Sequence, residues 1–212
     1  MSLMQRAIFI SVSSLIFCFG SAFAQRRVPR AEPQDLIQRF SAQEDKCRDM
    51  VKSRKWKEAE AVCKVAVQLA DQFTSDRELE QMGAYEMFGH VLMGQERYQE
   101  AITYYSRANE IARPRLNDTN AEVGRLYWDM GIAYHSLRNL DKAREFYRKA
   151  EKTYQFAYSK INPEEVTEDG IMIKQGYMRS LKQILQYHIR AAEQAEAAAE
   201  AAELKKQLEN LP

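Results

Sequence analysis

A spacing of 42 residues, found between three successive copies of one pattern, constrains the fold of this sequence more than any other feature. Similar side chains recur at this spacing in six columns, two of which hold only alanine. The columns are Trp56, Tyr98 and Leu140; Ala59, Ala101 and Ala143; Cys63, Tyr105 and Tyr147; Ala66, Ala108 and Ala150; Cys47, Gly89 and Gly131; and Met50, Leu92 and Tyr134. A fixed period of this length is typical of chains that stack copies of one small structural unit.

Within each copy, the column spacing predicts two packed α-helices joined by a short turn. Ala59, Cys63 and Ala66 are three or four residues apart and therefore lie on one helical face. Small residues on that face let a neighbouring helix approach closely. The chain has only 8 Gly and 5 Pro in 212 residues, too few for the many turns of a β-sandwich or barrel. We therefore expect an all-α protein whose helical hairpins stack on one another.

The columns resemble the motif of the tetratricopeptide repeat (TPR) family, W-x2-L-G-x2-Y…A-x3-F…P. The motif is met at Tyr85, Phe88, Gly89, Leu92, Ala101 and Tyr105, and again at Tyr127, Met130, Gly131, Tyr134, Ala143 and Tyr147, and more poorly in the first copy. The long period is similar to that of kinesin light chain repeats. The resemblance implies three hairpins over residues 35–160, arranged as a right-handed superhelix of antiparallel helix pairs closed by a long C-terminal helix. It also implies a non-catalytic scaffold that binds a partner protein or an extended peptide in its concave groove.

The region before the repeats has a different composition. Residues 1–24 combine Arg6, an apolar run and the sequence Ala22-Phe23-Ala24, which predicts a signal peptide cleaved after Ala24. We therefore expect an exported protein, periplasmic or secreted, with no transmembrane span after cleavage; an uncleaved membrane anchor is the alternative. Residues 25–34 are expected to form a flexible lead-in.

The region after the repeats is predicted to be helical in two parts. Asn162 and Pro163 are typical of a helix start, and residues 161–190 are expected to form a solvating helix that covers the third hairpin. Residues 191–212 are rich in Ala and Glu and predict a helical tail. The tail either projects as a single helix or pairs with another chain. In the second case the protein would be a structural assembly subunit that forms homo-oligomers through this helix or through its repeat ends.

The motifs of common enzymes and cofactor sites do not occur in the sequence: it has no G-x-S-x-G, G-x-x-x-x-G-K-[ST], H-E-x-x-H or G-x-G-x-x-G. We therefore expect no catalytic residues, no cofactor and no enzyme activity. The formal net charge of +1 argues against nucleic-acid binding. His90 and His135 fall on the first helices of their hairpins, but no third ligand is evident, so no metal site is predicted.

Cys47 and Cys63 are the two cysteines that remain after signal-peptide cleavage, and export would place them in oxidising conditions. If the first hairpin turns near Ser53, Cys47 lies opposite Ala59. Cys63 is then offset by about four residues, or roughly 6 Å along the helix axis, which strains a disulfide. A Cys47–Cys63 bridge and a pair of buried free thiols both remain open.

The surface through which a partner would bind follows from helical periodicity together with the family resemblance, because this family turns the adjoining face of each first helix toward its groove. A Trp beside an Ile, flanked by Arg and His, has the composition of a binding hot spot. The alternative is that the helix after Pro163 folds over Trp128 and buries it. The expected partner-binding residues are Arg125, Trp128, Ile132 and His135 in the third copy, Glu86, His90 and Met93 in the second, and Glu44 and Arg48 in the first.

Overall fold

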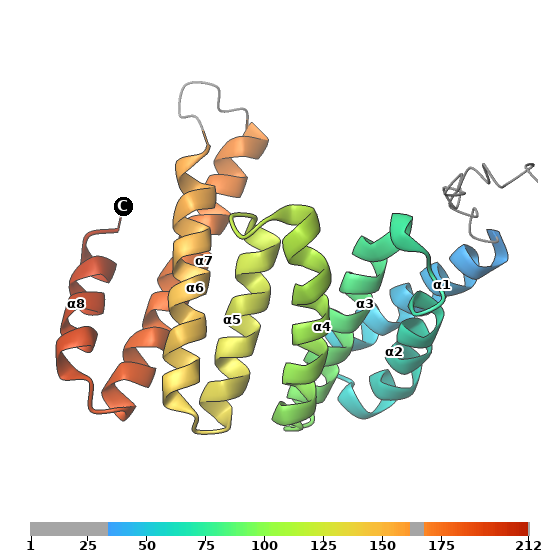
Figure 1. Ribbon diagram of the computed structural model, residues 1–212, viewed down its shortest axis with the longest axis horizontal. Coiled ribbons are helices and arrows are strands. Elements are labelled where there is room, and N and C mark those ends of the chain that lie inside the picture. The colour runs from blue at the N-terminus through green and yellow to red at the C-terminus, as the bar shows by residue number, and fades with distance from the viewer. Residues whose placement is uncertain (1–33, 162–167, 212) are drawn as a thin grey trace, which may run out of the picture. The chain divides into compact units, whose positions relative to one another are not determined.

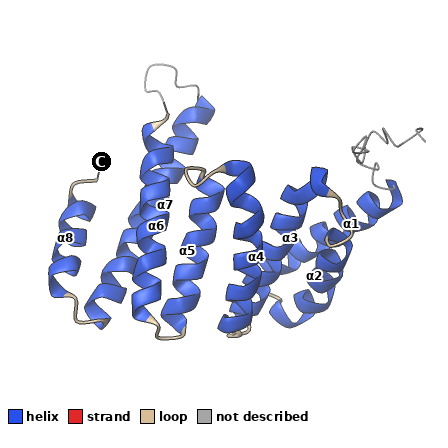
Figure 2. Cartoon of the chain, in the orientation of Figure 1, coloured by secondary structure: helices blue, strands red, loops and turns tan. Residues whose placement is uncertain are grey.

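The computed structural model describes residues 34–161 and 168–211, and within these ranges every regular element is a helix (Figure 2). The predicted signal peptide (1–24), the lead-in before residue 34 and the predicted helix start at Asn162 lie outside the described residues. Among the described helices, none combines the length and the apolar character that crossing a membrane requires. The elements are α1 (Gln34–Lys52), α2 (Trp56–Ala70), the short 3-10 helix η1 (Ser75–Arg77), α3 (Glu78–Gly94), α4 (Tyr98–Leu116), α5 (Ala121–Ser136), α6 (Leu140–Ser159), α7 (Glu168–Gln194) and α8 (Ala198–Glu209).

The helices form antiparallel pairs that pack in chain order. Helix α1 pairs with α2, α3 with α4, and α5 with α6, and the pairs join through the α2–α3, α4–α5 and α6–α7 contacts. Figure 1 shows this succession, from α1 in blue to α8 in red. The members of the two alanine columns are at most 1% exposed, so close helix packing accounts for their small size. The prediction of an all-α fold built from stacked helical hairpins is confirmed.

One turn geometry recurs at the tip of every hairpin. Arg54, Glu96, Arg138 and Glu196 occupy equivalent places, with φ angles of 54°, 63°, 60° and 57°. In all four turns the N–H of the following residue donates to the carbonyl oxygen five positions earlier. The shared geometry shows that α7 and α8 form a fourth hairpin.

The C-terminal region therefore differs from the expected division into a capping helix (161–190) and a separate tail (191–212). Helix α7 continues to Gln194, and the Ala-rich segment folds back as α8 to pack against α7. Ala201 and Leu204 of α8 are 4% and 5% exposed. The Ala-rich sequence thus packs within its own chain, because small side chains let α8 approach α7 closely.

In each hairpin, one repeated position of the first helix faces one repeated position of the second helix, and this contact sets the register. A side chain at Gly89 would lie 2.5 Å from the ring of Tyr105, and one at Gly131 would lie 2.6 Å from the ring of Tyr147, so both glycines are required by close approach. In the first hairpin the same two positions hold Cys47 and Cys63. They form a disulfide, with their Cα atoms 5.0 Å apart.

The expected register of the first hairpin is therefore wrong by about one helical turn. Arg54 adopts a left-handed conformation, and the chain reverses around Lys55 rather than Ser53. This shift of the turn places Cys47 opposite Cys63 instead of Ala59. The disulfide, which the sequence left open, occupies the position of the Gly–Tyr contact in the two following hairpins.

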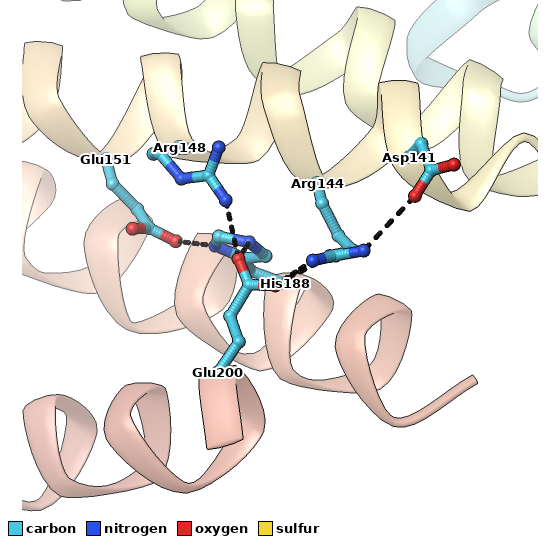
Figure 3. Close-up of polar contacts among 6 residues, drawn as sticks. All are labelled: Asp141, Arg144, Arg148, Glu151, His188 and Glu200. Carbon is cyan, nitrogen blue, oxygen red and sulfur yellow. Dashed lines mark hydrogen bonds and ion pairs between the residues drawn. The ribbon is translucent and has the colours of Figure 1, made fainter. Parts of the chain in front are cut away.

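A buried group of polar side chains, here called the C-terminal polar cluster, joins α6, α7 and α8 (Figure 3). His188 of α7 is 1% exposed, with Nδ1 2.5 Å from Glu151 Oε1 and Nε2 3.1 Å from Glu200 Oε1. Glu200 of α8 also accepts hydrogen bonds from Arg144 Nε at 2.7 Å and from a terminal nitrogen of Arg148 at 2.6 Å. One carboxylate thus ties α8 to both preceding helices.

Candidate functional site

The residues predicted to bind a partner lie on three first helices of hairpins: Glu44 and Arg48 on α1, Glu86, His90 and Met93 on α3, and Arg125, Trp128, Ile132 and His135 on α5. Eight of these nine are half-buried, and Glu86 is buried, at 4% exposed. Of these residues, the structure joins Glu86 and His90 of α3 with Arg125 of α5. Arg48 forms its ion pairs within α1, with Glu44 and Asp45, both at 2.7 Å.

Between α3 and α5, charged side chains form what we call the α3–α5 network: Glu86, His90, Glu122, Arg125 and Asp129. Arg125 pairs with Glu86 across the two helices and with Glu122 on its own helix. His90 Nε2 lies 3.0 Å from Asp129 Oδ2 and 4.0 Å from Glu86 Oε1. The charged side chains on this face therefore pair with one another within the chain.

Burial and mutual pairing change the proton affinities in the α3–α5 network. Burial raises the pKa of Glu86 to about 7, and the nearby Arg125 and His90 only partly oppose this rise. Burial disfavours the charged form of His90, but the Asp129 carboxylate outweighs it, so the pKa of His90 is raised. Burial likewise works against the Arg125 guanidinium, and Glu86 and Glu122 reverse that effect and raise its pKa. Glu86 and His90 therefore both keep a proton to higher pH than the free side chains do.

Trp128 lies at the junction of α5 and α7. Its ring meets Tyr187 of α7 edge-on, with centroids 6.3 Å apart, and the side chain remains half-buried. The indole Nε1 is shielded from solvent and has no hydrogen-bond partner among the residues that the structure describes. Helix α7 thus covers one side of Trp128 without enclosing it.

A pocket of about 350 Å³, here called the α5–α7 pocket, is lined by Tyr187, the residue that Trp128 contacts, but not by Trp128 itself. His135 lines this pocket, with Nδ1 3.3 Å from the hydroxyl of Tyr147 and Nε2 3.1 Å from Gln194 Oε1. His135 and His90 therefore belong to different groups of side chains. The α5–α7 pocket is lined by Tyr98, Ile132, His135, Ser136, Arg138, Tyr147, Tyr187 and Gln194.

Sequence reasoning did not include Asp129, Tyr187 and Gln194 among the site residues. Asp129 lies four residues after Arg125, on the same face of α5, and that spacing is a signal that could have found it. Tyr187 and Gln194 belong to the fourth hairpin, whose turn follows the third after 58 residues instead of 42 (Arg138 to Glu196), so the regular period does not reach them.

Comparison with known proteins agrees with this architecture. Residues 80–155 match the family model described as "Tetratricopeptide repeat". A search of curated proteins finds no match to the chain.

Several solved structures resemble the chain. A crystal structure of nearly identical TPR-like repeats of a kinesin light chain from Podospora anserina is 15% identical, with a TM-score of 0.50, covering 82% of this chain and 94% of that one. The TPR domain of Arabidopsis FLU is 23% identical, with a TM-score of 0.49, covering 54% and 93%. BtubC (BKLC) from P. vanneervenii is 13% identical, with a TM-score of 0.45, covering 84% and 91%. Residues 80–155, which lie in the second and third hairpins, thus match the tetratricopeptide repeat family model, and the fold of the chain is similar to that of the kinesin light chain repeats.

Proposed function

We propose that this protein is an exported, non-catalytic scaffold that holds a partner protein or an extended peptide in the TPR groove, on the surface formed by α3, α5 and α7. The TPR fold itself suggests a role in protein–protein interaction. The observation that carries the proposal is Trp128, a half-buried aromatic side chain in contact with Tyr187, which lines the α5–α7 pocket of about 350 Å³. Aromatic anchors next to pockets carry much of the energy of protein interfaces.

The residues around Trp128 suit a binding surface in which an apolar anchor is surrounded by polar groups. Ile132 and Tyr187 contribute apolar area next to Trp128, and His135, Arg138 and Gln194 provide donors and acceptors at the pocket.

Trp128→Ala tests this function, and Trp56→Ala is its matched control. Trp56 packs over Gly94 at the start of α2, away from the α5–α7 pocket, so its loss costs stability without touching the proposed surface. A partner identified by crosslinking in the cell envelope should bind the Trp128→Ala protein at least about 30-fold more weakly, the equivalent of about 2 kcal/mol. Equal binding by the Trp128→Ala and Trp56→Ala proteins would reject the groove.

Export is supported by two independent features. Residues 1–24 have the composition of a signal peptide, and a buried disulfide joins Cys47 and Cys63. Such bonds persist in oxidising compartments and are rare in the cytosol. N-terminal sequencing of the protein from its native host should start at Gln25, and a mature chain that starts at Met1 would contradict the signal peptide.

A structural assembly subunit is the second candidate. It is favoured by a surface of small side chains on the last hairpin, where Ala198, Ala201 and Ala202 line a hollow of about 300 Å³. Light scattering coupled to size exclusion discriminates the two functions: a monomer at all concentrations supports the scaffold, and a concentration-dependent dimer supports assembly.

A further inference from the structure

Three potential metal ligands converge within the α3–α5 network. Glu86 and His90 are four residues apart on one face of α3, and Asp129 faces them from α5. One ligand atom from each lies within 4.8 Å of the other two, and no other trio of this kind occurs in the described part of the chain. Glu86 and His90 also belong to the predicted partner-binding residues of α3, but none of the three ligands lines the α5–α7 pocket, so metal binding can be tested without a partner.

The chemistry of these ligands selects a class of metal. One imidazole nitrogen and two carboxylate oxygens suit zinc and similar transition ions, whereas Mg²⁺ and Ca²⁺ prefer oxygen ligands alone. Bonds of about 2.0–2.2 Å in a tetrahedron place ligand atoms roughly 3.3–3.6 Å apart. The separations from His90 Nε2 are 3.0 Å to Asp129 and 4.0 Å to Glu86, on either side of this range, and the third separation is within 4.8 Å.

The net negative charge of the α3–α5 network favours binding of a doubly charged cation. When ionised, the Glu86, Glu122 and Asp129 carboxylates outweigh the single Arg125 guanidinium by two negative charges, with His90 neutral. Glu86 is 4% exposed, and a buried carboxylate that stays ionised needs a cation beside it. Arg125 supplies that compensation in the metal-free protein. Because Arg125 also forms an ion pair with Glu122, it would keep one ion pair if it moved away from Glu86.

We propose that Glu86, His90 and Asp129 bind one divalent transition metal ion of the zinc class, and that Arg125 competes with the metal for Glu86. Three protein ligands leave a fourth tetrahedral position open, as in zinc sites that accept water or an external ligand. The repeat positions of the first hairpin that match Glu86 and His90 hold Glu44 and Arg48, and those of the third hold Trp128 and Ile132. The site is therefore specific to the junction of the second and third hairpins.

The test is calorimetric titration of the mature, chelator-treated protein with ZnCl₂, and with MgCl₂ in parallel. We expect one zinc ion per chain and no magnesium binding. His90→Gln should weaken zinc binding at least about tenfold, and so should Asp129→Asn, which leaves the buried carboxylate of Glu86 in place. His135→Gln is the matched control, because His135 is a half-buried imidazole of the neighbouring α5–α7 pocket and lies outside the trio.

If Arg125 competes with the metal for Glu86, replacing Arg125 should strengthen zinc binding rather than weaken it. Arg125→Gln should bind zinc about tenfold more tightly than the wild type, a gain that a merely structural role of Arg125 would not produce. Circular dichroism spectra of each variant verify the fold before titration. The proposal is overturned if neither the wild-type protein nor Arg125→Gln binds zinc with one-to-one stoichiometry, or if His135→Gln loses as much affinity as His90→Gln. Either result would leave the partner-binding surface around Trp128 unaffected.

Discussion

The contact between Gly131 and Tyr147 makes a quantitative prediction about how tightly each hairpin is packed. In Gly131→Ala the new Cβ would lie 2.6 Å from Tyr147 Cδ1 and Cε1 and 3.3 Å from Cγ, where ordinary contacts are 3.4–4 Å. The ring of Tyr147 cannot move away easily. It is 0% exposed, and the rings of Tyr187 and His188 lie about 6.1 Å from it on the α7 side.

Gly83→Ala is the matched control for this substitution. Gly83 also lies inside a helix, α3, but a Cβ there would meet nothing within 4 Å. Both variants gain about 1 kcal/mol from the better helix propensity of alanine. Only Gly131→Ala also bears the cost of overpacking, about 1–3 kcal/mol. We therefore expect Gly83→Ala to stabilise the protein, and Gly131→Ala to be less stable than Gly83→Ala by about 1–3 kcal/mol.

Urea denaturation followed by far-UV circular dichroism measures both variants against the wild type. The midpoint should rise for Gly83→Ala and lie clearly lower for Gly131→Ala. If the two substitutions raise the midpoint equally, the α5–α6 interface has room for a methyl group, and the argument that the glycine column is required by close approach fails.

Three further predictions concern the turns and the two ends of the repeat array. Reducing the Cys47–Cys63 bridge, which closes a loop with a sequence separation of 16 residues, should lower the free energy of unfolding by about 3 kcal/mol; denaturation that is unchanged by reductant would contradict this. Glu96→Gly should stabilise the protein by about 0.5–1 kcal/mol, because φ at this turn is 63°; a lower melting temperature would refute it. The pKa of Glu200 is lowered because its bonds to arginines outweigh burial, so Glu200 stabilises the last hairpin above pH 4.5 and this contribution is lost as the pH falls below that value. Glu200→Gln should therefore lower stability at pH 7 and weaken its dependence on acid, and an unchanged acid profile would disprove the role of Glu200.

The sequence predicts the hairpins well because their cause is local and periodic. Ala101 and Ala143 recur at the same place in each copy, and each is 0% exposed. The fourth hairpin lacks this signal: its turn follows the third after 58 residues, and Ile189 and Lys205 stand where the earlier copies have Gly and Tyr. Its helices are predictable from composition, but their pairing depends on a turn whose left-handed residue, Glu196, is not a glycine.

The site was predictable only in part, because its groups meet across helices. Helical periodicity places Glu86 and His90 on one face of α3, and this is a property of a single helix. The approach of Asp129 to His90 depends on how α3 and α5 are rotated against each other, which no spacing within one helix determines. The same limit applies to Cys47 and Cys63, since an error of two residues in the turn changes which side chains face each other.

The first and last hairpins of the array are stabilised by different kinds of bond, so we expect unfolding to begin at one particular end. The first hairpin carries a covalent bridge between Cys47 and Cys63, whereas the last is fastened by hydrogen bonds and ion pairs around Glu200 (Figure 3). In a stacked array each unit contacts only its neighbours, so opening begins at the less firmly held end. Under oxidising conditions below pH 4.5, hydrogen exchange should be fastest in α8 and then in α7. When α7 unfolds, Trp128 loses its edge-on contact with Tyr187. Opening of the last hairpin would therefore change one side of the partner-binding surface.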